Sequence, residues 1–233
     1  MKTLHKNRQP KAAGFTIVEL LLATAVFSFV LLVALAAFLG VGHLFYKGVS
    51  LTSTQSIANQ VINDMSNNMI GASSVTKPTS SGGYTYMCIG NSRYTYTSVS
   101  GKTVYAQDSG GINYNNGSSG GNYGLLKDQL PSNGSCLAPT AATLSSNGAV
   151  EMLTTNMRVA NVYICGVNAS TTLYNIDIVV AYGDNSALTF GSAPASQCGE
   201  PTYPKVSCQG NYSNQAFCSV VKQDTTAFVG ART

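Results

Sequence analysis

An uninterrupted apolar segment from Phe15 to Tyr46 constrains the fold of this chain more than any other feature. Its 32 residues include one acidic residue, Glu19, and no basic residue. As a helix the segment would be about 48 Å long, whereas about 20 residues suffice to cross the hydrocarbon core of a bilayer. The segment therefore predicts a single membrane-spanning helix that is longer than the bilayer requires.

The net positive charge of the 233-residue chain comes from the residues that precede this segment. Four basic residues and no acidic residue stand before Gly14: Lys2, Lys6, Arg8 and Lys11. The nine basic residues that follow are balanced by nine acidic ones. Because nucleic-acid binding needs an excess of clustered cations, nucleic acid is not expected as the main ligand. The basic leader instead predicts an N-terminus in the cytoplasm and a C-terminal region on the other side of the membrane.

A secretory signal peptide with a cleavage site at Ala34-Leu35-Ala36 is the first alternative. Its apolar region would be only about 7–15 residues long, which is much shorter than the segment here. A carboxylate near the start of a spanning helix also costs ~2.5–3.5 kcal/mol on insertion. A segment that is inserted and then discarded gains nothing from this cost, so Glu19 is expected to have a functional partner.

The sequence around Glu19 resembles a known family signature. Gly14-Phe15-Thr16-Ile17-Val18-Glu19 follows a basic leader and precedes Leu20-Leu21-Leu22-Ala23, and it resembles the prepilin signature of type IV pilins and type II secretion pseudopilins. The resemblance implies that a prepilin peptidase cuts between Gly14 and Phe15 and methylates the new amino group of Phe15. It also implies that Glu19 pairs with the N-terminal amine of a neighbouring subunit during assembly.

This resemblance implies a structural subunit, a major or minor pilin, of a surface filament for adhesion, motility or DNA uptake. The implied partners are other pilin subunits, the prepilin peptidase/methyltransferase and an inner-membrane assembly platform. The chain would lie in the cytoplasmic membrane before assembly and in a cell-surface pilus afterwards. A minor pseudopilin of a type II secretion system, and a membrane-anchored binding module that never polymerises, are the alternatives.

Beyond the membrane segment, the apolar residues indicate an amphipathic helix that ends near Gly71. Those of its apolar face recur every three or four positions: Ile57, Ala58, Val61, Ile62, Met65, Met69 and Ile70. The opposite face is polar: Asn59, Asn63, Asp64, Asn67 and Asn68. One apolar face predicts that this half of the helix packs on a sheet.

After Pro78 the period of the pattern changes to two, which predicts strands. The expected strands are 84–89, 94–97, 103–105 and an antiparallel pair, 158–165 with 174–182. Three connections are also expected: a long loop of low complexity at 106–124, one helical turn at 125–130, and a hairpin at Asn147-Gly148.

These patterns predict an α+β pilin fold, in which a long N-terminal membrane-spanning helix continues into an amphipathic half packed on an antiparallel β-sheet headgroup. The expected parts are a cytoplasmic leader at 1–14, a transmembrane and filament-core helix at 15–46, an amphipathic helix at 47–71, and an extracytoplasmic headgroup at 72–233.

All six cysteines lie in the exported region: Cys88, Cys136, Cys165, Cys198, Cys208 and Cys218. An even number in an exported domain predicts disulfides, and 15 pairings are open. A metal site is not expected, because there is no Cys-x-x-Cys pair and the two histidines, His5 and His43, lie outside the headgroup.

Catalysis is not expected either. The headgroup has no histidine for a Ser-His-Asp or Cys-His arrangement. Its acidic residues are scattered, and Asp177 fits the solvent face of a strand. Phosphate-binding glycine patterns are also missing from the sequence, so neither an enzyme nor a cofactor is predicted.

Overall fold

A computed structural model of the chain describes the N-terminal helix and most of the β-rich region that follows it. The described residues are 14–81, 84–96, 112–114, 121–131, 135–154, 156–166, 172–183, 187–190, 206–209 and 217–230. The chain divides into two compact units, Met1–His43 and Leu44–Thr233. The leader before Gly14, the expected strand 103–105 and Cys198 lie outside the described residues.

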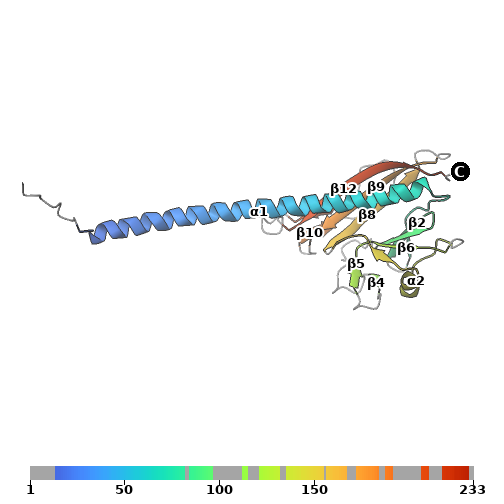
Figure 1. The fold of residues 1–233 in the computed structure, drawn as a ribbon, viewed down its shortest axis with the longest axis horizontal. Helices are drawn as coiled ribbons and strands as arrows, with labels where there is room; N and C mark the ends of the chain where they lie inside the picture. The colour runs from blue at the N-terminus through green and yellow to red at the C-terminus, as the bar shows by residue number, and fades with distance from the viewer. Residues whose placement is uncertain are drawn as a thin grey trace, which may run out of the picture. The chain divides into compact units, whose positions relative to one another are not determined.

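One helix of 54 residues, α1 (Ile17–Ile70), follows the apolar segment and the amphipathic segment without a break (Figure 1). It ends immediately before Gly71, as predicted. None of the described residues of the first unit is buried. The buried residues of α1 all belong to the second unit and form one stripe: Ser50, Thr54, Ala58, Val61, Ile62, Met65 and Met69.

This α1 stripe confirms the predicted amphipathic helix and corrects its ends. Ile70, expected on the apolar face, is 43% exposed because it is the last helical residue. At the other end the stripe begins with Ser50 and Thr54. Both are polar, so the pattern of apolar residues did not include them. Hydroxyl groups can be buried there because each donates to a backbone carbonyl of α1, Lys47 O for Ser50 and Ser50 O for Thr54.

A three-stranded antiparallel sheet covers one side of the α1 stripe (Figure 1). Its strand order is β12-β9-β8, with bounds Ser219–Phe228, Leu173–Tyr182 and Met157–Gly166. The expected pairing of 158–165 with 174–182 is confirmed. Ile176, Ile178 and Val180 point from β9 into the core that contains the stripe, because alternate residues of a strand face the same side.

A five-stranded antiparallel sheet completes this core. Its strand order is β1-β2-β3-β6-β7, with bounds Thr79–Ser81, Tyr84–Ile89, Ser92–Tyr96, Leu126–Gln129 and Val150–Glu151. Met87, Tyr94 and Tyr96 are fully buried in the same core as the α1 stripe. The α+β class, one long N-terminal helix packed with antiparallel sheets, is therefore confirmed.

The predicted helical turn at 125–130 is wrong. Residues Leu126–Gln129 form strand β6, which pairs with β3 on one side and β7 on the other. Four residues form few hydrogen bonds as an isolated helical turn, whereas two neighbouring strands satisfy the backbone on both sides. The tertiary environment therefore decides the conformation of this segment.

The hairpin predicted at Asn147-Gly148 is wrong as well. These residues terminate a short helix, α2 (Ala141–Ser146), and Gly148 has the positive φ of 62° that often follows a helix. Thr140 caps the start of this helix, because its Oγ1 accepts a hydrogen bond from the Thr143 N–H at 3.2 Å. The Asn-Gly pair thus marks a helix end and not a turn between strands.

Within the expected loop at 106–124, two short strands are described. β4 (Ile112–Tyr114) pairs antiparallel with β5 (Gly121–Tyr123). The other residues of 106–120 lie outside the described residues. A low-complexity sequence therefore contains a small antiparallel pair that its composition did not indicate.

A cluster of polar side chains joins the last part of α1 to the five-stranded sheet. Lys127 Nζ lies 2.8 Å from both carboxylate oxygens of Asp64, and the Tyr94 hydroxyl donates to Asp64 Oδ2 at 2.6 Å. Asn68 Nδ2 donates to the Tyr94 hydroxyl oxygen at 2.8 Å. Burial, followed by the contact with Asp64, raises the pKa of Tyr94 far above its ordinary value. Asp64, expected on a solvent-facing polar surface, instead fixes how the helix lies on the sheet.

A second polar contact joins α1 to β12. Thr54 Oγ1 and Ser219 Oγ are 2.6 Å apart, and both residues are buried. Ser219 Oγ also donates to Ser50 O at 3.2 Å. Each buried hydroxyl therefore has a partner, and the contact sets the position of the sheet along the helix.

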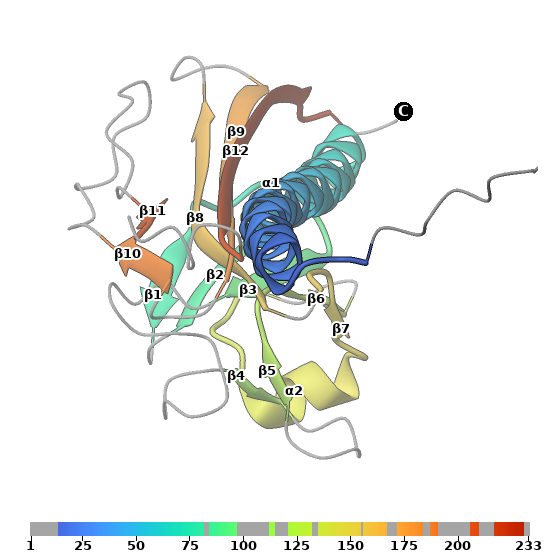
Figure 2. The same cartoon turned by 90° about the vertical axis from the view of Figure 1, so that its left-hand side faces the viewer.

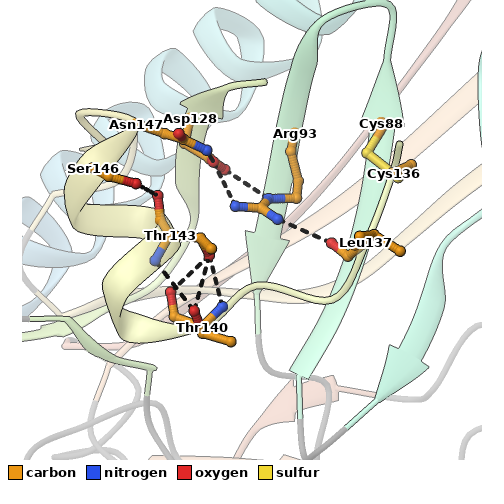
Figure 3. A network of polar contacts seen from close by, with 9 residues as sticks. All are labelled: Cys88, Arg93, Asp128, Cys136, Leu137, Thr140, Thr143, Ser146 and Asn147. Atoms are coloured by element: carbon orange, nitrogen blue, oxygen red, sulfur yellow. Dashed lines mark hydrogen bonds and ion pairs between the residues drawn. A yellow bond between two sulfur atoms is a disulfide. The ribbon is translucent and has the colours of Figure 1, made fainter. Parts of the chain in front are cut away.

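The outer face of the five-stranded sheet is closed by residues 135–149, which include α2. In both ribbon views α2 lies across this sheet from α1 (Figures 1 and 2). A buried ion pair stands between the sheet and this segment (Figure 3): Arg93 Nε and Nη2 lie 2.9 and 2.6 Å from the two carboxylate oxygens of Asp128. Arg93 Nη1 donates to Leu137 O, and Asn147 Nδ2 donates to Asp128 Oδ2, both at 2.9 Å. The pair thus holds the start and the end of the covering segment.

Two disulfides fasten the covering layers. Cys88 on β2 is bonded to Cys136 at the start of the segment that carries α2, and Cys208 is bonded to Cys218. Their sequence separations of 48 and 10 residues correspond to about 4 and about 3 kcal/mol of unfolded-state entropy. Cys165 is also disulfide-bonded.

The Cys208–Cys218 disulfide belongs to a second, smaller core on the outer face of the three-stranded sheet. There β10 (Leu188–Phe190) pairs with β11 (Val206–Cys208), and Leu188 is buried with Ala181 of β9. The three-stranded and the five-stranded sheet therefore each have α1 on one face and a disulfide-linked covering on the other.

Glu151 in β7 is a largely buried carboxylate. Its Oε1 accepts hydrogen bonds from the Leu125 and Leu153 N–H groups at 3.0 and 2.9 Å. Burial raises the pKa of Glu151 to about 7, against the opposing effect of these backbone donors. The folded state therefore binds a proton near neutral pH that the unfolded state releases.

Replacing Arg93 with Met is expected to lower the free energy of unfolding by about 3–5 kcal/mol, because Asp128 would remain charged and buried without its cation. The double variant Arg93→Met/Asp128→Leu should recover most of this loss. The measurement is urea unfolding of the full chain in detergent, followed by tyrosine circular dichroism, since the chain has no tryptophan.

The matched control for this prediction is Lys222→Met. The Lys222–Asp177 pair is 3.9 Å apart and partly exposed, so its loss should cost no more than about 1 kcal/mol. Equal effects of the Arg93 and Lys222 substitutions would show that the buried pair has no special role.

Glu151 gives a prediction about pH. Because its pKa is about 7 in the folded chain and 4.5 at its ordinary value, its contribution to stability is complete below pH 4.5 and lost as the pH rises through 7. The stability of Glu151→Gln relative to the wild type should therefore rise by about 3 kcal/mol between pH 4.5 and pH 8. Urea unfolding across this range measures it, with the exposed Asp224→Asn as control. Parallel curves for wild type and Glu151→Gln would contradict the assignment.

Candidate assembly site at the start of α1

The residues singled out from the sequence stand at the beginning of α1. Gly14, Phe15 and Thr16 precede the helix, and Glu19 lies in its first turn. The Phe15 side chain is 75% exposed and is not part of a hydrophobic core. The structure therefore presents this end of the helix to its surroundings.

Glu19 caps its own helix. Its Oε2 accepts hydrogen bonds from the Thr16 N–H at 3.0 Å and from the Thr16 hydroxyl at 2.8 Å, while Thr16 Oγ1 accepts from the Glu19 N–H at 3.3 Å. This reciprocal arrangement is a capping box, which satisfies two backbone donors that the helix leaves unpaired.

The capping role of Thr16 was not predicted from the sequence. The spacing Thr-x-x-Glu at the start of an apolar helix is itself the signal of a capping box, and it could have been found without a structure. It gives Glu19 a role within the chain in addition to any role between chains. Both of its contacts fall on Oε2, so Oε1 carries no hydrogen bond within the described residues.

The flank of the helix that carries Glu19 is otherwise apolar. A shallow groove runs along it from Phe15 to Val30, and Glu19 is the single ionisable residue among those that line it. The carboxylate therefore stands at the edge of a surface against which another apolar helix could pack.

The exposed apolar residues continue along α1 well beyond this groove. The large, exposed apolar residues are spread along the whole segment and include Ile17, Leu21, Leu22, Val26, Phe29, Leu32, Leu35, Phe38, Val41, Leu44 and Phe45. Exposure of this much contiguous apolar surface to water is unfavourable. By length and composition α1 is sufficient to cross a membrane, which fits membrane anchoring.

The other residues considered from the sequence lie in the second unit. The cysteines belong to the covering layers of the two sheets, and Asp177 lies on β9. No group of three or more His, Cys, Asp or Glu residues suited to a metal ion occurs in the part of the chain that the structure describes. The candidate site therefore consists of Gly14, Phe15, Thr16 and Glu19 with the apolar surface beside them.

Residues 9–35 match the family model of the prokaryotic N-terminal methylation motif. This motif is the type IV pilin and prepilin signature. The chain carries the prepilin signature. The match covers Gly14 to Glu19 and the apolar segment as far as residue 35, so it includes Gly14, Phe15, Thr16 and Glu19.

No curated protein and no solved structure matches the chain. The motif and the long apolar helix together support a type IV pilin-like or pseudopilin protein. They indicate a structural subunit and not an enzyme. The motif also implies processing by a prepilin peptidase and assembly with other pilins at the membrane.

Proposed function

We propose that this prepilin-like chain is a subunit of a type IV pilin-like surface filament. A prepilin peptidase cuts it between Gly14 and Phe15, Phe15 is methylated, and residues 15–46 anchor the subunit in the membrane before forming the filament core. The observation that carries this proposal is a prepilin motif on a helix whose exposed apolar surface holds one carboxylate, Glu19.

Charge explains why cutting at this place leads to assembly. Removing residues 1–14 takes away four cations and leaves one ammonium on Phe15, next to the N-terminal end of the helix dipole. An ammonium and a carboxylate in an apolar environment are each costly alone, and pairing recovers much of that cost. Glu19 Oε1 is free to accept the ammonium of a neighbouring subunit while Oε2 remains bound to Thr16.

Pairing between chains produces a filament. If the Phe15 ammonium of one subunit meets the Glu19 carboxylate of the next, the two helices are staggered along their axes. Such a contact uses two different surfaces and does not close on itself, so it can be repeated without limit. The headgroup, residues 72–233, would then lie on the outside, where its disulfides resist unfolding.

We favour a pilus, major or minor, with a role in adhesion, motility or DNA uptake. The disulfide-fastened coverings of both sheets support a headgroup exposed outside the cell. A minor pseudopilin of a type II secretion system is the second candidate, because the same motif and helix serve it equally well. The two differ in whether the subunit leaves the membrane in a shearable fibre.

Replacing Glu19 with Gln is expected to reduce the chain recovered in sheared surface filaments at least about tenfold, because an unpaired buried ammonium costs more than the 1.4 kcal/mol that tenfold represents. The amount in the membrane should be unchanged. Intact mass and N-terminal sequencing of both fractions measure this, and the wild-type chain should begin at methylated Phe15.

The matched control is Thr16→Val, which removes a capping hydroxyl but keeps the Glu19 charge, so it should still assemble. Normal filaments from Glu19→Gln would contradict the charge pairing. Recovery of wild-type chain from membranes alone would favour the pseudopilin. A chain that still begins at Met1, or begins after Ala36, would contradict prepilin processing.

A further inference from the structure

A polar groove lies where the last turn of α1 meets the five-stranded sheet. Its volume is about 420 Å³, and its walls come from the end of α1, the β2–β3 turn and the end of β6. Its polar lining consists of amide and hydroxyl side chains: Asn67, Asn68, Ser73, Asn91, Ser92 and Gln129. Within the described part of the chain, no charged residue lines it.

Part of this lining is held in place by its own hydrogen bonds. Gln129 Nε2 donates to Ser92 Oγ at 3.0 Å, and Ser92 is 3% exposed. Asn68 is fixed by its bonds to Asp64 and to the Tyr94 hydroxyl. These groups are therefore oriented before any ligand arrives, which lowers the entropy cost of binding.

Other polar groups of the groove are free to bind. The amides of Asn67 and Asn91 are exposed and make no side-chain hydrogen bond within the described residues. Gln129 uses its amide nitrogen on Ser92, so its carbonyl oxygen stays available. Each free primary amide offers donors and an acceptor side by side.

We propose that this groove binds a neutral, hydroxyl-rich ligand, of the chemical class of an oligosaccharide. Vicinal hydroxyls are donors and acceptors at close spacing, which is what fixed amides can match. Ala72 and Ile89 lie in the wall of the groove but are only 3% and 1% exposed, so the accessible lining is made mainly of the amides. A charged ligand finds no opposite charge on the lining residues. The inference goes beyond filament assembly and needs only the second unit.

The test is binding of three neutral disaccharides, lactose, maltose and N,N′-diacetylchitobiose, to the full chain in phosphatidylcholine nanodiscs. Nanodiscs are used because the sugar head groups of maltoside detergents would compete with the disaccharides for the groove. Saturation-transfer NMR detects binding, and titration gives the Kd. At least one disaccharide should bind, and Asn91→Ala/Gln129→Ala should weaken it at least about tenfold, the effect of losing one to two hydrogen bonds.

Two further variants make the test specific. Gly71 lines the groove, so Gly71→Phe should abolish binding by placing a ring there. The fold should tolerate the change, since a Cβ at Gly71 meets nothing within 4 Å and its φ is not left-handed. Asn59→Ala, an exposed asparagine of α1 that does not line the groove, should leave the Kd unchanged. Urea unfolding confirms that all variants are folded.

Failure of all three disaccharides to bind the wild-type chain at about 50 mM, well above the range of weak specific binding, would overturn the proposal. Binding that Gly71→Phe and the double variant leave unchanged would also overturn it. Because unassembled subunits are used, neither outcome depends on whether the chain forms a pilus.

Discussion

Burial of the α1 stripe, from Ser50 to Met69, against two antiparallel sheets is the interaction on which the rest of the structure depends. The three-stranded and the five-stranded sheet each have an apolar face that must be buried against another element, and the helix supplies the cover for both. Apolar packing alone would allow the helix to slide. The contacts of Asp64 with Lys127 and Tyr94, and of Thr54 with Ser219, fix its position.

The outer faces of the two sheets, which point away from α1, are covered as well. Each sheet is buried on its second face under α2 and its neighbours or under the β10–β11 pair. These coverings are short segments with little core of their own. They are held by the Arg93–Asp128 ion pair and by disulfides at Cys88–Cys136 and Cys208–Cys218. The headgroup can therefore tolerate a Gly- and Ser-rich sequence, because cross-links restrict the unfolded chain.

Within the first unit, Met1–His43, the apolar residues of α1 are exposed and not buried against a sheet. These residues have no core to enter and are stable only in lipid or against other helices. Glu19 fits both settings. Its Oε2 completes the capping box with Thr16, and its Oε1 carries no hydrogen bond within the described residues. The prepilin motif, the exposed apolar surface and this carboxylate are the observations on which the proposed assembly mechanism rests.

The sequence by itself determined the features that depend on local pattern. The apolar segment, Glu19, the end of α1 at Gly71 and the pairing of 158–165 with 174–182 all follow from periodicity and residue chemistry, which act within a few residues. A capping box at Thr16 was also present in the sequence, although the interpretation of Glu19 as an assembly residue overlooked it.

Only the tertiary structure decided features that depend on distant partners. Leu126–Gln129 is a strand because β3 and β7 lie beside it, and Asn147-Gly148 ends a helix because Asn147 reaches Asp128. Asp64 is half-buried because Lys127, 63 residues later, lies next to it. Two cysteine pairs were selected from 15 arrangements by proximity in the fold. No local pattern contains these contacts, since each forms only after the sheets have assembled on the helix.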